Sequence, residues 1–257
     1  MKPHTHTQSW MVFGTTWLLA AWALSGCATQ EHWNLVEGQH AQHFKGEVRK
    51  PVSGQFLLYL PKGFAKHSDV KYPLMIFLHG SGESGRDIEK VKVNGPPKFL
   101  DTRTDFPFIV ASPQAPMSRT GFDMEALNLM LENLLQRLPI DRDRVYLTGL
   151  SMGGYWSYDW ASQHPELFAA VAPISGAWDP ADACNLKTVP IWAFHGALDD
   201  VVNPADDQAM VDAIKACGGD ITYTVYPDVG HGAWEPAYAD PKLYDWLLSH
   251  RRGQTKH

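Results

Sequence analysis

The sequence predicts one α/β domain, a mostly parallel central sheet with helices on both faces. Short, almost wholly apolar runs alternate along the chain with longer segments of helical periodicity, which is typical of this class. Runs such as Leu74–Leu78 lack the alternation of a half-exposed strand, and they fit strands covered on both faces. The 257 residues, 44% hydrophobic and 19% charged, are ordinary for a single globular domain.

The expected elements begin after residue 50. Strands are predicted at Gly54–Leu60, Pro73–His79, Phe106–Ser112, Arg144–Gly149, Ala169–Ser175, Val189–His195 and Ile221–Tyr226. Helices are predicted at Asp123–Leu138, Met152–His164, Ala205–Cys217 and Pro241–Ser249. In the first helix apolar residues recur every three or four positions, which gives one face for the sheet, and Pro139 ends it.

The first 26 residues have the pattern of a secretory signal. Lys2 is their one formal charge, and an apolar run follows over residues 10–24. The run ends in Leu24–Cys27, which resembles the bacterial lipobox and implies acylation of Cys27; an ordinary signal peptide with a chance cysteine is the alternative. By resemblance to Gram-negative sorting rules, Ala28 implies the outer membrane. Such an anchor attaches a protein to a bilayer without spanning it.

The segment after the signal is expected to be a tether. Residues 28–50 are polar and lack periodicity, so a tether is expected over residues 27–50 and the folded domain over residues 51–257. The net charge of −6 and the absence of a basic run argue against a nucleic-acid partner. No apolar stretch reaches the roughly 18 residues of a spanning helix. The sequence carries no signal for an oligomeric state.

Two cysteines within the predicted domain are candidates for a disulfide. Cys184 precedes the strand predicted at Val189–His195, and Cys217 ends the helix that follows that strand. In a βα unit the helix runs back antiparallel to its strand, so its end returns near the start of the strand. An oxidising cell envelope would permit the bond, and two separate buried thiols are the alternative.

The segment Gly149–Gly154 reads G-x-S-x-G and has the surroundings of a nucleophile elbow. It follows an apolar strand and opens a helical stretch. The turn is so tight that positions two before and two after Ser151 must lack side chains, and it lifts the Ser151 hydroxyl above the sheet edge. A plain strand-to-helix turn with a capping serine is the alternative.

A serine hydroxyl needs a base, and the chain supplies one in the order serine, aspartate, histidine. The strand predicted at Val189–His195 is followed by Asp199, and the next strand is followed by His231. Because parallel strands end at one edge of a sheet, Ser151, Asp199 and His231 are expected to meet there.

Neighbouring residues compete for two of these roles. Asp200 is the alternative acid, although it could instead be solvated or cap the following helix. His195 stands at the end of that strand and before a glycine, so a packed structural histidine is expected. Asp228 follows a proline and suits a turn.

Acyl transfer also requires N–H donors for an oxyanion. One is expected to be the backbone N–H of Met152, directly after the nucleophile. The others are expected in the glycine-rich loop His79–Gly85, with Ser81 first and Gly82 next, by analogy with HG-type oxyanion loops. A simple flexible loop is the alternative.

Together these segments resemble the α/β-hydrolase fold. More narrowly they resemble bacterial phospholipase/carboxylesterase and dienelactone-hydrolase-like proteins, some of which are called predicted peptidases. The resemblance covers roughly residues 50–250 and rests on His79–Glu83, Gly149–Gly154, Phe194–Asp199 and Gly230–His231. It implies a serine nucleophile, an acid and a base at Ser151, Asp199 and His231. The sequence departs from the family pattern at Ser84 and Asn203, and neither residue carries a proposed catalytic atom.

The predicted activity is hydrolysis of short-chain or carbohydrate-linked esters, such as acetyl or feruloyl esters. Trp178 and Trp234 follow strand ends near the site and are candidates for the pocket wall, with core packing as the alternative. No insertion is long enough for a large lid. No cofactor and no metal are expected, because the chain has no H-E-x-x-H motif. A serine peptidase and a non-catalytic envelope binding protein are the competing interpretations.

Overall fold

A computed structural model describes residues 33–47, 51–65, 69–116 and 121–254. The expected signal peptide, the expected lipidation site Cys27 and the first part of the expected tether lie outside these ranges.

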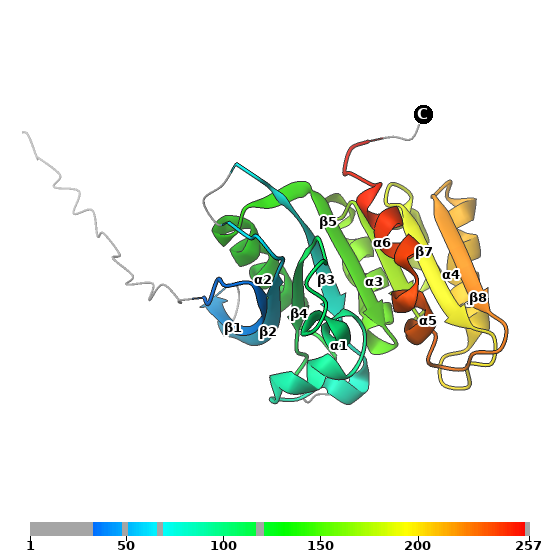
Figure 1. Ribbon diagram of the computed structural model, residues 1–257. Coiled ribbons are helices and arrows are strands. Elements are labelled where there is room, and N and C mark those ends of the chain that lie inside the picture. Colours follow the sequence, from blue (N-terminus) through cyan, green and yellow to red (C-terminus); the bar gives the residue numbers. More distant parts are fainter. Residues whose placement is uncertain (1–32, 48–50, 66–68, 117–120, 255–257) are drawn as a thin grey trace, which may run out of the picture. The chain divides into compact units, whose positions relative to one another are not determined.

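The described chain forms an eight-stranded sheet with the order β1-β2-β4-β3-β5-β6-β7-β8 (Figure 1). The strands are β1 (Gly38–Glu47), β2 (Pro51–Leu60), β3 (Tyr72–Leu78), β4 (Ile109–Pro113), β5 (Ile140–Leu150), β6 (Ala170–Ile174), β7 (Ile191–Gly196) and β8 (Ile221–Tyr226). The neighbouring pairs from β4 to β8 are parallel, whereas β1 with β2 and β2 with β4 are antiparallel. The predicted mostly parallel sheet is confirmed, and each predicted strand is present with its ends shifted by a few residues at most.

The tether expected over residues 27–50 needs a correction, because Gly38–Glu47 is the edge strand β1. Its side chains alternate: Gln42 and Phe44 are buried, and the residues between and beside them are exposed. The alternation is easily missed because one buried position is polar. The Gln42 amide exchanges two hydrogen bonds with the backbone of Asn34, at 2.8 and 3.0 Å, so it can be buried without loss.

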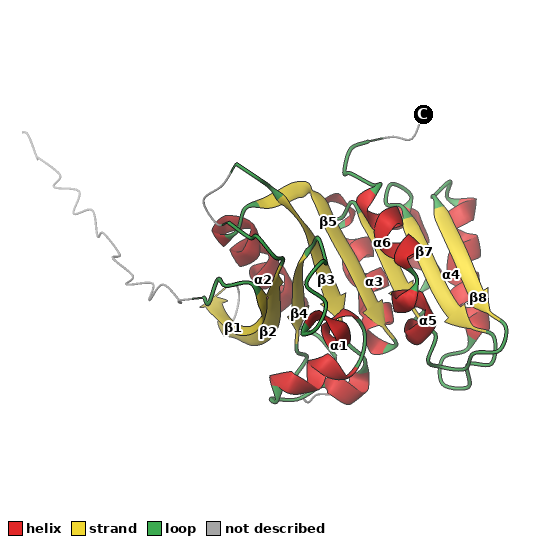
Figure 2. Cartoon of the chain, in the orientation of Figure 1, coloured by secondary structure: helices red, strands yellow, loops and turns green. Residues whose placement is uncertain are grey.

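Helices cover both faces of the sheet (Figures 1 and 2). They are α1 (Pro96–Leu100), α2 (Met124–Arg137), α3 (Met152–Gln163), α4 (Pro204–Ala216), α5 (Trp234–Ala239) and α6 (Pro241–Leu248). Four 3₁₀ helices join them, η1 (Ser81–Glu83), η2 (Ile88–Val93), η3 (Pro165–Leu167) and η4 (Pro180–Leu186). α2, α3 and α4 lie on one face and α1, α5 and α6 on the other, so the chain has two apolar cores separated by the sheet.

α1 and α5 are helices that the periodicity did not predict. They have five and six residues, fewer than two turns, which is too short for an apolar stripe to recur. The longer predicted helices are all present. In α2, for example, Leu127, Met130, Leu131 and Leu134 are the buried residues, at the spacing expected for a face on the sheet.

The two cysteines predicted to pair are bonded in the structure. Cys184 lies in η4 and Cys217 is the residue that ends α4, and their Cα atoms are 5.2 Å apart. The bond thus ties the segment before β7 to the end of the helix after it. This is the geometry expected of a helix that returns along its own strand.

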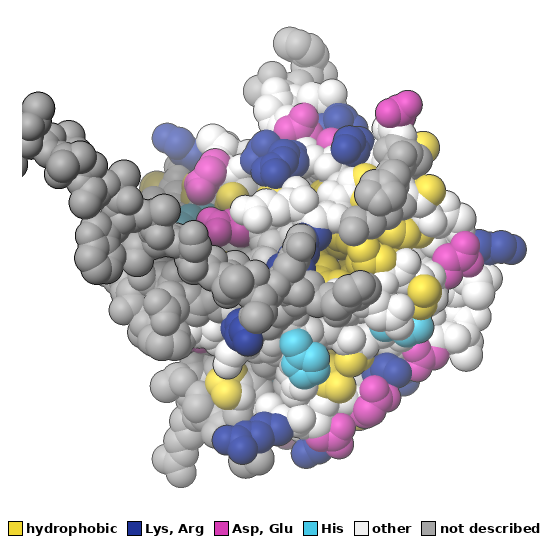
Figure 3. Space-filling model, turned by 90° about the vertical axis from the view of Figure 1, so that its left-hand side faces the viewer, with side chains coloured by type: hydrophobic (Ala, Val, Ile, Leu, Met, Phe, Trp, Pro, Cys, Tyr) yellow, Lys and Arg dark blue, Asp and Glu magenta, His cyan; other side chains and the backbone are white. Residues whose placement is uncertain are grey.

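The described surface carries charges of both signs. Figure 3 views the side on which β1 lies, where Lys, Arg, Asp and Glu side chains are interspersed with small apolar groups. Within the described ranges, none of the helices combines the length and the apolar character needed to cross a bilayer.

Removal of the disulfide is expected to destabilise the protein. Replacing both Cys184 and Cys217 with serine should lower the free energy of unfolding in urea by about 2–4 kcal/mol, because the bond closes a loop of 33 residues in the unfolded chain. Wild-type protein unfolded under reducing conditions is the control and should match the variant. Equal stability of the oxidised wild type and the variant would contradict the prediction.

Candidate active site

Ser151 stands at the sharp turn between β5 and α3. Its φ is +52° and its ψ is −117°, a backbone conformation that L side chains rarely adopt. The Ser151 N–H donates to the Ile174 carbonyl of the neighbouring strand β6 at 2.9 Å. That bond holds the turn in place, and strain held by surrounding structure is typical of a functional position.

The glycines around Ser151 are required by close backbone contacts. A Cβ on Gly149 would collide with the Gly153 carbonyl, and one on Gly153 would collide with the Leu78 carbonyl at the end of β3. A Cβ on Gly154 would lie 2.7 Å from the Ile174 carbonyl oxygen. The turn therefore packs directly against the ends of β3 and β6, which explains why its side chains must be absent.

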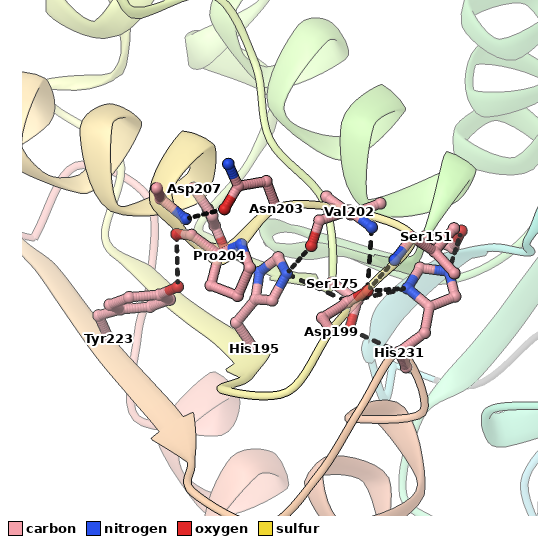
Figure 4. A network of polar contacts seen from close by, with 12 residues as sticks. Ser151, Ser175, His195, Asp199, Val202, Asn203, Pro204, Asp207, Tyr223 and His231 are labelled. Atoms are coloured by element: carbon pink, nitrogen blue, oxygen red, sulfur yellow. Dashed lines mark hydrogen bonds and ion pairs between the residues drawn. The ribbon is translucent and has the colours of Figure 1, made fainter.

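Three side chains predicted from the sequence form a hydrogen-bonded chain (Figure 4). The Ser151 Oγ lies 2.8 Å from His231 Nε2. The other ring nitrogen, His231 Nδ1, lies 2.9 and 3.1 Å from the two carboxylate oxygens of Asp199. The residues follow β5, β7 and β8, whose carboxyl ends share one edge of the sheet.

Asp199 is an ionised acceptor that orients the histidine. Burial alone would raise the pKa of Asp199, but the Val202 amide, the His231 ring and the Val201 amide together hold it below its ordinary value. The two amides donate to Asp199 Oδ1 at 2.9 and 3.0 Å. A carboxylate at Nδ1 requires a proton there, so the lone pair of His231 Nε2 faces the Ser151 hydroxyl. This arrangement can accept the serine proton during nucleophilic attack.

Two further residues hold His231, and one of them was not foreseen. The Ser175 hydroxyl donates to the His231 carbonyl at 3.0 Å from a backbone with φ of +47°. Trp234 packs edge-on against the His231 ring, with centroids 5.1 Å apart and planes at 88°. Trp234, a candidate for the pocket wall, thus lies beside the triad. Ser175 directly follows β6 at the same sheet edge, which is the signal that could have found it.

The loop after β3 is pinned against the nucleophile turn. His79 is fully buried; its Nδ1–H donates to the Gly80 carbonyl, and its Nε2 accepts from the Ala115 N–H at 2.9 Å. Burial lowers the pKa of His79, which fits this neutral form. The carboxylate of Glu83 is buried as well and accepts from the Asn94 amide at 2.6 Å. Contacts with the residues that follow β4 and η2 therefore fix the position of the loop.

The expected oxyanion donors are unpaired peptide groups. In the described part of the chain, the N–H groups of Ser81, Gly82 and Met152 have no hydrogen-bond acceptor. Ser81 and Gly82 lie in η1, and Met152 is the first residue of α3. A Cβ on Gly80 would lie 2.9 Å from Leu150, so this loop borders the turn that carries Met152.

The remaining candidates lie outside the triad. Trp178 is half-buried against the core on the α3 side, and its indole N–H donates to Asp182 at 2.9 Å. Asp200 and Asp228 are exposed. His195 is buried as expected of a structural histidine, yet it also contacts the triad acid.

A cavity of about 700 Å³ opens at the same sheet edge, beside the loop after β3. Its lining includes Phe44 of β1, Gln55 of β2, Gln114 after β4 and Phe122 before α2, but no member of the triad. β4 is separated from β5 by β3 alone, so the cavity begins about 10 Å from the nucleophile turn, given the spacing of neighbouring strands. It therefore lies apart from the side chains of the triad.

The sequence and the structure are similar to those of known hydrolases. Residues 119–242 match the dienelactone hydrolase family, a span that holds all three triad residues. A bifunctional acetylxylan esterase/xylanase of Neocallimastix patriciarum is 28% identical over 57% of this chain and 21% of its own length. A protein of Aspergillus terreus named "Probable feruloyl esterase C" is 28% identical over 71% of this chain and 64% of its own.

Among solved structures, a thermostable esterase aligns with a TM-score of 0.69 and 30% sequence identity. The alignment covers 82% of this chain and 63% of that one. The present chain therefore spans less than two thirds of the length of each of these three proteins.

The glycine contacts predict a steric effect on stability. Gly153→Ala should lower the free energy of unfolding by more than about 3 kcal/mol, because the new methyl group would overlap the carbonyl of Leu78. Gly232→Ala is the matched control, since no atom lies within 4 Å of its added Cβ. Urea unfolding measures both, and equal stability of the two variants would contradict the prediction.

Proposed function

We propose that this chain, which is of the α/β-hydrolase type and carries a dienelactone hydrolase family domain over residues 119–242, is a serine carboxylesterase. One observation carries the proposal: a serine on a strained turn lies 2.8 Å from a histidine that is oriented by a buried carboxylate. A turn serving only as a helix start would not need that histidine or that strain.

Acylation begins when the Ser151 Oγ attacks the ester carbonyl carbon. The His231 Nε2 takes the hydroxyl proton, and Asp199 stabilises the resulting imidazolium. The peptide N–H groups of Met152, Ser81 and Gly82 stabilise the negative charge on the carbonyl oxygen. The C–O bond to the alcohol then breaks, and the proton on His231 goes to the leaving alkoxide, which leaves an acyl-serine.

Deacylation repeats these steps with water. His231 removes a proton from a water molecule, whose oxygen attacks the acyl carbon, and the bond to Ser151 Oγ breaks. The proton returns to the serine, and the carboxylic acid leaves. The chemistry thus needs no group besides those that the chain itself supplies.

We infer a short acyl group or an acetyl or feruloyl ester of a carbohydrate as the substrate. The names of two relatives, an acetylxylan esterase and a feruloyl esterase, support this class. The segment between β6 and β7 holds only η4, which favours an open site without a large lid. The 700 Å³ cavity along the sheet edge gives room for a sugar on the alcohol side.

We further propose that the protein is a lipoprotein of the cell envelope, held in the outer membrane through Cys27. The support is the segment Leu24–Cys27 behind an apolar run. The bonded pair Cys184–Cys217 fits an oxidising compartment. An anchored esterase would meet esters that reach the cell surface or the periplasm.

The nucleophile assignment predicts a large loss on substitution. Ser151→Ala should lower kcat/KM on p-nitrophenyl acetate and butyrate, and on methyl ferulate, by at least about a thousandfold. p-Nitrophenyl decanoate should be a poor substrate of the wild type, because no large lid is expected to cover a long chain.

A neighbouring pair of aspartates supplies the control for this assay. Asp199→Asn should lose most of the activity, whereas Asp200→Asn should keep it, because Asp200 is exposed and lies outside the hydrogen-bonded chain. A wild type that is inactive on every ester, or a Ser151→Ala variant as active as the wild type, would refute the esterase assignment.

The anchor proposal predicts a change of compartment. Full-length Cys27→Ala should lose incorporation of radiolabelled palmitate and should move from the membrane pellet to the soluble envelope fraction, because the thiol that would receive the lipid is gone. A variant that keeps the label and still sediments with membranes would contradict lipidation at Cys27.

A further inference from the structure

His195 lies directly behind the triad acid and is completely buried (Figure 4). Its Nε2 lies 3.2 Å from Asp199 Oδ2 and 3.1 Å from the Val202 carbonyl oxygen. Its Nδ1 lies 2.8 Å from Asp207 Oδ2. Both ring nitrogens therefore face oxygen atoms, and one of these oxygens belongs to the triad acid.

Asp207 is a buried carboxylate with two donors. It stands on α4 at the position that faces the sheet, on the same stripe as Met210, Val211 and Ile214. The Tyr158 hydroxyl donates to its Oδ1 at 2.9 Å, and His195 contacts its Oδ2. A charged residue on an apolar helix stripe requires such partners.

The oxygen atoms around His195 fix where its hydrogens lie. A lone pair on Nε2 would face two oxygens and repel them, so Nε2 must carry a hydrogen. One more proton lies between Nδ1 and Asp207. Burial alone would lower the pKa of His195, but the Asp207 carboxylate raises it. Burial raises the pKa of Asp207. Both directions favour the same state, in which the pair keeps its shared proton.

We propose that His195, held by Asp207, is a positioning residue for the ester hydrolysis proposed above: its Nε2–H, bonded to the Val202 carbonyl and 3.2 Å from Asp199 Oδ2, holds the Asp199 carboxylate against His231. The inference rests on that function and extends it to a second histidine–aspartate pair. His195 acts through Asp199 and touches no substrate.

The contacts of Val202 give His195 a second way to position Asp199. Val202 donates its N–H to Asp199 Oδ1 at 2.9 Å and accepts from His195 through its carbonyl. His195 therefore lies in ion-pair contact with the carboxylate and, through its hydrogen bond to Val202, holds the loop whose amides orient it. Without the Nε2–H, the Val202 carbonyl would lose its hydrogen bond, and a lone pair would stand 3.2 Å from Asp199 Oδ2.

Two substitutions distinguish the loss of the Nε2–H donor from the loss of the volume of the imidazole ring. In His195→Gln the side-chain amide nitrogen can reach the place of Nε2, whereas in His195→Asn the amide reaches only the place of Nδ1. The rate of Ser151 labelling by a fluorophosphonate reports nucleophile activation without depending on the natural ester. kcat and KM for p-nitrophenyl acetate and the melting temperature complete the measurement, all on the full chain.

If His195 is a positioning residue, the two variants should differ in their rates of labelling and turnover. His195→Asn should label and turn over at least about tenfold more slowly than the wild type, with KM unchanged, because the Val202 loop and the carboxylate that orients His231 lose their contact with the Nε2–H. His195→Gln should stay within about threefold of the wild type, although both variants melt at similarly lowered temperatures. Equal rates in the two variants with an active wild type would overturn the positioning role alone. A wild type inert to both reagents would overturn the esterase proposal with it.

A measurement on the wild type covers the case in which neither variant folds. In ¹⁵N-histidine-labelled protein, the His195 Nε2 should show a directly bonded hydrogen throughout the pH range in which the protein is folded. An unprotonated Nε2 at neutral pH would overturn the proposal, because no donor would then point at Asp199.

Discussion

The carboxylate of Asp199 is the constraint on which the site depends. It is a buried charge, and such a charge is tolerated only when its oxygens are satisfied. Here the donors are the amides of Val201 and Val202 and the ring of His231, and His195 lies in ion-pair contact at 3.2 Å. Since these groups belong to β7, the loop after it and the loop after β8, satisfying one carboxylate fixes the relative placement of three segments.

The parallel sheet makes this arrangement possible. Strands that run in one direction deliver their following loops to one edge, so Ser151, Asp199 and His231 meet although 80 residues separate the first from the last. The same edge holds the loop after β3 and the cavity beside it. The close approach of Gly153 to Leu78 keeps the nucleophile turn and that loop in contact. A shift of one strand would therefore disturb both the nucleophile and the donors expected to face it.

The sequence predicted much of this, and its failures have physical causes. The buried strands, the long helices, the disulfide and the proximity of the triad residues follow from apolar runs, periodicity and chain order. β1 was missed because a polar residue, Gln42, occupies a buried position, and α5 because six residues cannot show a helical period. The indole N–H of Trp178 donates to Asp182, and the place of Trp178 at the pocket wall stays a prediction.

The sequence by itself determined which residues could react and the order in which strands would deliver them, because a tight glycine turn and the ends of apolar strands are local features. Only the tertiary structure decided how the acid is held. In the sequence, Asp207 is a charged residue on the apolar stripe of α4, and His195 is expected only to pack in the core. The fold places Asp207 Oδ2 2.8 Å from His195 Nδ1, and it places His195 Nε2 3.2 Å from Asp199 Oδ2. Contacts between buried polar groups depend on distances between elements, and those distances exist only once the elements are packed.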